Sequence, residues 1–251
     1  MVKFRIIPVV LTDGTTVVKG TNFNNWRTVG SAEATSRLFA ARDVDELIFL
    51  DVGARAKGLS IDINLVRAFS NQLNIPFAVG GGIDDFDSAA ECLRNGAEKI
   101  VLGTSAYRNP NLVSELSETF GAQAVVVTID ILQPESDKFA INSGREIVSS
   151  VSALEFAMRI QDLGAGEIIL QCISQDGLQE GYDLRSLEDF SSKLKIPVIA
   201  SSGAGSVRDF ERAYRMGASG AAAGAIFQFT QITPKVVRED LRSLGIPVRR
   251  S

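Results

Sequence analysis

The sequence predicts an α/β protein built as a closed (β/α)₈ TIM barrel, and three observations support this fold class. Short apolar runs alternate with helix-like stretches along the 251 residues. Eight of these runs are continuously apolar, which is typical of parallel strands buried on both faces. The glycine pattern also repeats along the chain. Eight strands with intervening helices in about 250 residues match such a barrel, whereas an open doubly wound sheet, the alternative, usually has fewer strands.

The predicted strands follow one another with enough chain between them for helices. They comprise residues 4–10, 46–52, 77–80, 99–103, 124–130, 167–173, 198–200 and 220–225. Helices are predicted for residues 31–42, 87–95, 152–163 and 206–216. Ser31 suits the N-cap of the first helix. The other three are followed by Gly96, Gly164 and Gly217, which suit the left-handed position after a helix.

An internal repeat with a spacing of 121 residues relates the two halves of the chain. Residues 45–50 match 166–171, and residues 75–78 match 196–199. The matched glycine pairs are Gly82 and Gly203, Gly96 and Gly217, and Gly103 and Gly224. Matched glycines are informative because glycine answers a backbone requirement, although chance similarity of two amphipathic segments is the alternative. The repeat predicts one domain, residues 1–251, made of half-barrels at about 1–123 and 124–251.

Composition excludes several function classes. The net charge of −4 argues against a nucleic-acid partner. No apolar run reaches the roughly 20 residues that a membrane span needs, and the N-terminus lacks a signal peptide's apolar core, so a cytoplasmic protein is expected. Two cysteines provide neither a disulfide framework nor a zinc cluster. The absence of histidine removes Ser-His-Asp catalysis and imidazole metal sites, and we predict no metal and no cofactor.

Glycine-rich loops after four predicted strands predict two phosphate sites. Glycine at such a strand end lets backbone N–H groups approach an anion, and nearby hydroxyls add donors. The candidate phosphate-binding residues of the two halves are Gly82, Gly103 and Thr104, and Ser202, Gly203, Gly224 and Ala225. Two symmetric sites suit a ligand with a phosphate at each end. The alternative is that these glycines only form tight turns against the strands.

The sequence resembles the cyclase subunit of imidazole glycerol phosphate synthase (HisF) from Lys3 to Arg249. The resemblance rests on residues 5–8, 18–23, 46–51, 79–83, 164–168 and 181–183, which read RIIP, VKGTNF, ELIFLD, VGGGI, GAGEI and GYD. It implies a barrel of the ribulose-phosphate-binding type with its active site at the C-terminal face. It also implies a HisH-like glutaminase partner on the opposite face, ammonia passing through the barrel, and a substrate with two phosphates, to which Gly177 is matched as a phosphate-binding residue.

Four charged residues stand at the starts of predicted strands and should meet at the N-terminal face of the barrel. They are Arg5, Glu46, Lys99 and Glu167. Two cations and two carboxylates can pair into a ring around the barrel axis. The resemblance matches them to the family's gate for ammonia, and the alternative is a purely structural salt-bridge layer.

The predicted active face keeps one expected acid–base group and lacks the other. The resemblance implies two aspartates on strands one and five. Asp130 matches the second, but Leu11 occupies the first position, and leucine cannot transfer a proton. Asp13 lies two residues further, roughly 6–7 Å along an extended strand, so it is a doubtful substitute.

Three further residues are predicted to bind substrate. Lys19 resembles a family substrate-loop lysine, or is a solvated loop charge. Asp51 ends strand two, and Asp176 matches the family's strand-six pattern, although the threonines and the Asp-Arg pair of that pattern are replaced in residues 171–178. The stretch 21–28, with Phe23 and Trp26, is expected to be a loop able to close over a ligand.

Three functions remain open from the sequence. The first is a HisF-like subunit of a glutamine amidotransferase complex, which passes ammonia to an ATP-dependent amidotransferase for acetamidino sugars of surface polysaccharides. Leu11 favours it, because a side branch of the family carries leucine there. The second is an authentic cyclase of histidine biosynthesis. The third is a non-catalytic scaffold that binds a phosphorylated small molecule.

Overall fold

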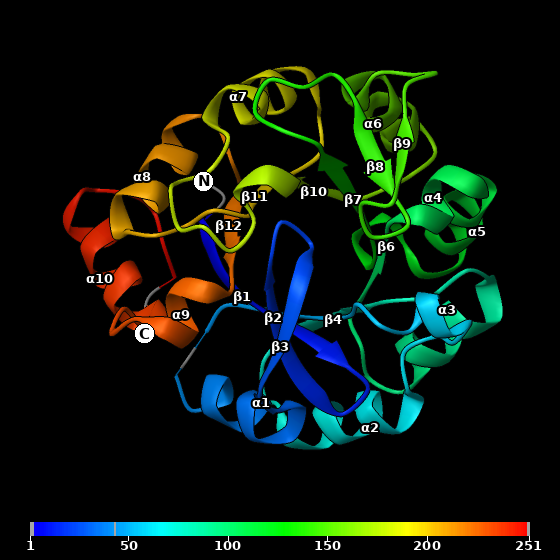
Figure 1. Cartoon of the computed structure of the whole chain (residues 1–251), viewed down its shortest axis with the longest axis horizontal. Coiled ribbons are helices and arrows are strands. Elements are labelled where there is room, and N and C mark those ends of the chain that lie inside the picture. Colours follow the sequence, from blue (N-terminus) through cyan, green and yellow to red (C-terminus); the bar gives the residue numbers. More distant parts are fainter. Residues whose placement is uncertain (1–2, 43, 250–251) are drawn as a thin grey trace.

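The computed structural model describes residues 3–42 and 44–249, and these residues contain a closed barrel of eight parallel strands (Figure 1). Each strand pairs with the next, and the last pairs with the first, so no edge is left open. The predicted barrel is therefore confirmed, and the open-sheet alternative is excluded. The strands are β1 (Arg5–Asp13), β4 (Leu47–Asp51), β5 (Phe77–Gly80), β6 (Lys99–Leu102), β7 (Val125–Ile131), β10 (Glu167–Cys172), β11 (Val198–Ser201) and β12 (Gly220–Ala223).

Helices surround this barrel on its outside (Figure 1). The four predicted helices are present: three have slightly shorter bounds, and the one predicted at 87–95 lies one residue earlier, at Phe86–Arg94. The Ser31 hydroxyl accepts the Ala34 N–H at 3.2 Å as the N-cap of the first of these helices. None of the helices in the described ranges is long and apolar enough to cross a membrane. The helices are α1 (Ala32–Ala40), α2 (Ile63–Gln72), α3 (Phe86–Arg94), α4 (Thr104–Arg108), α5 (Asn111–Phe120), α6 (Ala153–Asp162), α7 (Leu184–Lys193), α8 (Val207–Arg215), α9 (Ala225–Phe229) and α10 (Pro234–Ser243), with short 3₁₀ turns η1 (Arg55–Lys57), η2 (Ala122–Ala124) and η3 (Ile173–Gln175).

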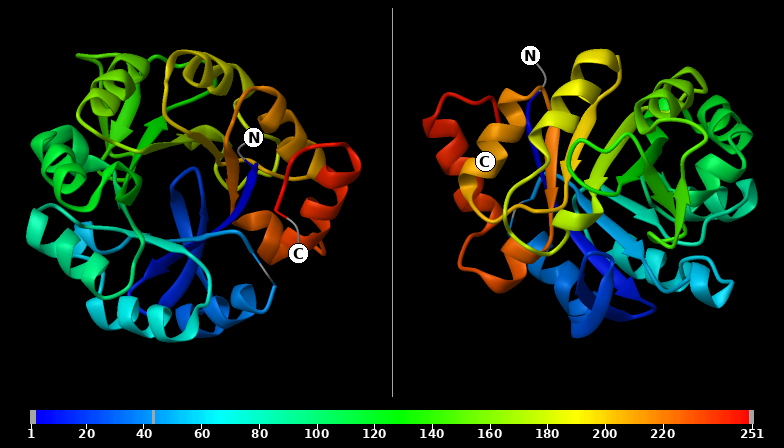
Figure 2. Two further views of the ribbon diagram at one scale, coloured as in Figure 1. Left: turned by 180° about the vertical axis from the view of Figure 1, so that it is seen from behind. Right: turned by 45° about the horizontal axis from the view of Figure 1, so that its top comes forward.

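Two antiparallel hairpins extend the barrel beyond the predicted elements (Figure 2). β2 (Thr16–Thr21) and β3 (Asn24–Ser31) continue from β1, and β8 (Phe139–Ile141) and β9 (Glu146–Val148) continue from β7. The expectation of a loop at residues 21–28 is therefore wrong for most of that stretch. All eight residues of β3 are exposed, so no apolar alternation marks it as a strand.

The apolar core has two layers because each barrel strand is buried on both faces. Side chains inside the barrel form one cluster that consists of Ile7, Val9, Ile48, Ala78, Val101, Val126, Ile169, Ile199 and Ala222. A larger cluster packs between the strands and the helices. Leu11 and Leu50, partners in the β1–β4 register, lie partly buried on top of the inner cluster. The barrel interior is therefore apolar between its two ends.

Candidate active site

A cavity of about 170 Å³ opens at the C-terminal ends of the barrel strands, where barrel enzymes place their active sites. The β2–β3 hairpin lies across this opening (Figure 1) and contributes Gly20, Phe23 and Trp26 to the wall. The structure brings together in this wall every substrate-, phosphate- and proton-handling residue predicted from the sequence. They are Lys19, Asp51, Gly82, Gly103, Thr104, Asp130, Asp176, Gly177, Ser202, Gly203, Gly224 and Ala225.

Gly82 and Gly203 occupy equivalent places after β5 and β11. Both have positive φ angles, 66° and 105°. A Cβ atom at Gly82 would overlap the carbonyl oxygen of Leu59, and one at Gly203 would overlap that of Gly181. Only glycine therefore fits these two turns, whether or not a phosphate binds there. The two matched glycines of the sequence repeat therefore form the same kind of turn at corresponding places in the barrel.

Gly103 and Gly224 form a second equivalent pair, each immediately before a short helix, α4 or α9. The hydroxyl oxygen of Thr104 accepts the N–H of Asn142 at 2.7 Å, which leaves its proton free to be donated. Ser202 has a φ of 72° and its hydroxyl donates to Asp176 over 3.5 Å. Glycines that begin helices and hydroxyl side chains thus line the cavity from both halves of the barrel.

Lys19 on β2 is buried, with 6% of its surface exposed, and is not the solvated loop charge of the alternative interpretation. Its Nζ donates to the carbonyl oxygen of Val9 at 3.4 Å and covers Gly224. Burial lowers the pKa of Lys19 to about 8, against an opposing contribution from the negative charge of Asp176. The cavity therefore contains an amine that titrates just above neutral pH.

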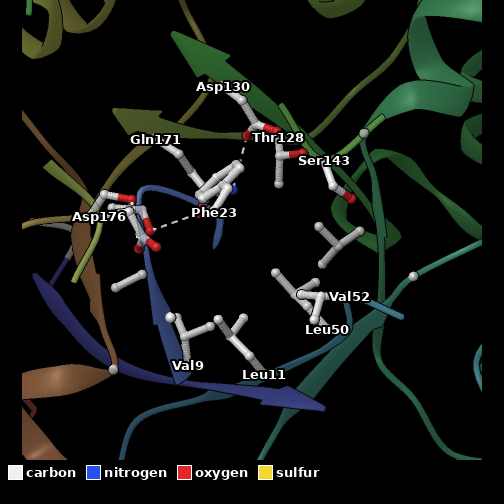
Figure 3. Close-up of a pocket in the computed structure, with 18 of the residues that line it drawn as sticks. Val9, Leu11, Phe23, Leu50, Val52, Thr128, Asp130, Ser143, Gln171 and Asp176 are labelled. Atoms are coloured by element: carbon white, nitrogen blue, oxygen red, sulfur yellow. Dashed lines mark hydrogen bonds between the residues drawn. The ribbon is translucent and has the colours of Figure 1, made fainter. Parts of the chain in front are cut away.

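Asp130 projects into the cavity from β7 (Figure 3). Burial raises its pKa to about 7; a hydrogen bond from Gln171 opposes this shift, and the charge of Asp176 adds to it. The Gln171 Nε2 donates to Asp130 Oδ1 at 3.0 Å. A carboxyl group that titrates near neutral pH can both accept and donate a proton there, as general acid–base catalysis requires.

The wall opposite Asp130 is apolar at the position where the second acid–base group was expected. Figure 3 shows Leu11 and its neighbours Val9, Leu50 and Val52 facing Asp130 across the cavity. Asp13 is not part of the wall, and its carboxylate instead pairs with the exposed Lys57. Asp13 therefore does not replace the missing group.

Asp51 lines the cavity at the end of β4, but its oxygens are occupied by the backbone. They accept the N–H groups of Gly14, Gly53 and Ala54 at 2.9–3.1 Å. Burial raises the pKa of Asp51, and these three hydrogen bonds oppose that shift. This geometry holds the loops after β1 and β4 together beside the cavity.

The four charged residues predicted to meet at the opposite end of the barrel form one connected ring, which we call the charged ring: Arg5, Glu46, Lys99 and Glu167. The Lys99 amine lies 2.7 Å from Glu46 and 2.9 Å from Glu167, and Arg5 pairs with the same two carboxylates. The carboxylate side chains are 6% and 8% exposed. Each cation thus bridges both anions, as pairing of buried charges demands.

Comparison with known proteins places this geometry in a family. A family model described as "Histidine biosynthesis protein" matches residues 5–233. The imidazole glycerol phosphate synthase subunit HisF of Chlorobium limicola is 39% identical over 251 residues, which cover 99% of this chain and all of that protein. The chain belongs to the HisF family. HisF subunits of Thermotoga sp. strain RQ2 and Streptomyces avermitilis are 35% and 37% identical, each over 98% or more of both chains. The resemblance predicted from the sequence motifs is confirmed.

Sequence reasoning missed Gln171 and Ser201, which line the same cavity in this HisF-family chain. Both sit at the ends of barrel strands, and Gln171 was noted only as a departure from the family pattern. The signal that would have identified them is their place in the strand register, because Gln171 stands opposite Asp130 on one side and Ser201 on the other. That register becomes known only once the pairing of these three strands is known.

Proposed function

We propose that this chain is the ammonia-accepting barrel subunit of a glutamine amidotransferase of the HisF type. A HisH-like glutaminase releases ammonia at the charged ring, and the ammonia crosses the barrel to the cavity at the C-terminal face. There it meets a ligand with a phosphate at each end, held by the glycine loops of the two half-barrels. The chain acts within a heterodimer with that glutaminase.

The observation that carries this proposal is the layered interior of the barrel. The charged ring closes one end, the cavity with Asp130 opens at the other, and among the described residues the apolar inner cluster lies between them. Neutral NH₃ has a much smaller desolvation cost on entering apolar surroundings than ammonium ion, which carries a full charge. The ring and the cavity therefore suit the two ends of an ammonia path.

The names of the relatives favour the cyclase reaction of imidazole glycerol phosphate synthase as the use of this ammonia. Under this proposal the ribulosyl aminoimidazole-carboxamide bisphosphate fills the cavity. Asp130 then exchanges protons with the substrate near neutral pH, and Lys19 neutralises part of the phosphate charge at the second half-barrel. No cofactor is required.

A second candidate function is favoured by Leu11 alone. With leucine opposite Asp130, the cavity lacks one of two proton-transfer groups while the charged ring keeps all its members. Such a barrel suits the delivery of ammonia to another protein, an ATP-dependent amidotransferase that forms acetamidino sugars for surface polysaccharides. A third candidate, a scaffold that only binds phosphate, does not use the charged ring.

The test compares turnover of the bisphosphate with free ammonium and with glutamine plus a HisH-type glutaminase. We expect Lys99→Ala to lower the glutamine-dependent rate about tenfold or more, because both ring carboxylates lose a cation and the ring loses its pairing. The ammonium-dependent rate should change little, because Lys99 lies at the far end of the barrel from the cavity. The exposed Lys235→Ala serves as the matched control.

Equal loss of both rates in Lys99→Ala would contradict an ammonia role for the charged ring. Turnover of the unmodified protein would establish the cyclase. Absence of turnover in a chain that still binds a glutaminase would favour ammonia delivery to another protein. Binding of the bisphosphate without turnover and without glutaminase binding would favour the third candidate, a scaffold that only binds phosphate.

Lys19 gives the proposed phosphate site a pH dependence. The folded pKa of about 8 lies below the usual 10.5, so the amine is charged below pH 8 and neutral above it. We expect calorimetric titration with inorganic phosphate or a bisphosphate to show affinity falling as pH rises above 8. Lys19→Met should weaken binding about tenfold to a hundredfold at pH 7 and remove this pH dependence. Phosphate binding that changes neither with pH nor on Lys19→Met substitution would contradict the placement of Lys19 in the phosphate site.

A further inference from the structure

Three neighbouring barrel strands place a row of polar side chains at one level of the cavity wall. In the parallel register, Gln171 of β10 stands opposite Asp130 of β7 and opposite Ser201 of β11. Residues at matching register positions of adjacent parallel strands point to the same side of the sheet, here into the barrel. The closed sheet thus brings together side chains that are 30 and 41 residues apart in sequence.

These side chains form one directed chain of hydrogen bonds. The Ser201 hydroxyl donates to Gln171 Oε1 at 3.3 Å, and Gln171 Nε2 donates to Asp130 Oδ1 at 3.0 Å. Figure 3 shows Gln171 and Asp130 on the same side of the cavity. When Asp130 is ionised, chemistry determines the direction of this chain. If the amide were reversed, its oxygen would face a carboxylate oxygen, and two acceptors would meet without a proton between them.

We propose that Gln171 is a positioning residue for Asp130, and that Ser201 acts through Gln171 by holding the amide in the orientation that donates to the carboxylate. Among the described residues, Gln171 is the side chain that donates a hydrogen bond to Asp130. One carboxylate oxygen is thereby fixed against the wall, and Oδ2 is left for a ligand. This inference deepens the proposed function, since it concerns the carboxyl group that the proposed proton transfer uses.

The pair also adjusts the charge state of Asp130. The remaining ionisable side chains that line the cavity are Lys19, Asp51, Arg55 and Asp176. Of these, Asp176 acts against ionisation of Asp130, and burial acts in the same direction. A hydrogen bond to the charged form opposes both effects, so loss of the Gln171 donor should raise the pKa of Asp130 above 7.

The experiment is an NMR titration of ¹³C-labelled aspartate carboxyl groups in the full-length chain, with Asp130→Asn to assign the signal. We expect Gln171→Met, which keeps the side chain's size and removes the donor, to raise the titration midpoint of Asp130 by about one unit. Ser201→Ala should raise it less. The double variant should match Gln171→Met alone, because Ser201 acts only through the amide. Gln123→Met, the same change at an exposed site, should leave the midpoint unchanged.

An unchanged midpoint in folded Gln171→Met would overturn the proposal, as would a Ser201→Ala shift that persists without Gln171. If Gln171→Met does not fold, Ser201→Ala tests the proposal instead. An Asp130 midpoint in Ser201→Ala equal to that of the unmodified chain would then contradict it. The readout does not depend on turnover. A shifted midpoint in a protein without cyclase activity would refute the proposed cyclase reaction and keep the positioning role of Gln171. Cyclase turnover with no shift of the midpoint would keep the proposed reaction and refute the positioning role.

Discussion

Replacing Leu11 with aspartate is expected to raise the ammonium-dependent cyclase rate at least about 100-fold. The change restores a carboxyl group opposite Asp130, where Leu11 now faces it across the cavity (Figure 3). A positioned general acid or base contributes roughly 10²–10⁴-fold to a rate, and here one of the two expected groups is absent. Leu11 is partly exposed to the cavity, so an aspartate there keeps access to water. Steady-state turnover of the bisphosphate with ammonium at high pH measures the effect.

Leu11→Asn is the matched control, because asparagine has the shape of aspartate and cannot transfer a proton in the same way. We expect no gain from it. A gain equal to that of Leu11→Asp would show that the polarity of the wall, and not proton transfer, limits the rate. An unmodified protein that already turns over rapidly, with no gain in Leu11→Asp, would contradict the proposed consequence of the leucine. Absence of cyclase turnover in both Leu11→Asp and Leu11→Asn would favour ammonia delivery to another protein.

Replacing Asp130 with asparagine is expected to change activity and stability in opposite directions. Any cyclase turnover, in the unmodified protein or in Leu11→Asp, should fall about 10²–10⁴-fold, because the neutral amide cannot exchange the proton. Packing should be kept, since the amide oxygen can still accept the hydrogen bond from Gln171. Turnover that survives in Asp130→Asn would exclude Asp130 as the acid–base group.

The stability of Asp130→Asn should depend on pH in a direction determined by the raised pKa. The folded pKa of about 7 exceeds the usual 3.8, so the folded protein holds this proton more tightly than the unfolded chain. Below pH 4 the Asp130 carboxyl is neutral in both the folded and the unfolded state, so it does not lower the free energy of unfolding. Between pH 4 and 7 ionisation increasingly penalises the folded state, and above pH 7 the penalty is constant at no more than about 4 kcal/mol.

Asp130→Asn should therefore unfold at higher urea concentration than the unmodified protein at pH 8, by about 1–4 kcal/mol in unfolding free energy, and at a similar concentration near pH 4. Asp162→Asn, the same change at an exposed helix-end residue outside the cavity, provides the comparison. Equal stability of Asp130→Asn and the unmodified protein at pH 8 would mean that Asp130 does not carry a raised pKa in the folded state.

Much of the fold was predictable because the local signals agree with the tertiary structure. Continuous apolar runs marked the eight barrel strands, and glycines marked the ends of three helices at Gly96, Gly164 and Gly217. The β3 strand was not predictable, since its eight residues are all exposed and gain their structure from pairing with β2 and not from burial. A strand that buries nothing leaves no hydrophobic period in the sequence.

The sequence by itself determined the barrel, the family, the four residues of the charged ring and most of the polar residues of the cavity, but not Gln171 and Ser201. These depend on glycine at turns such as Gly82 and Gly203 and on residue types at strand ends, which local chemistry dictates. Only the tertiary structure decided what those residues do to one another. Burial by distant strands lowers the pKa of Lys19 and raises that of Asp130, and the closed register aligns Ser201, Gln171 and Asp130. Such effects depend on distances between residues that are far apart in sequence, and these distances exist only once the strands have paired and packed.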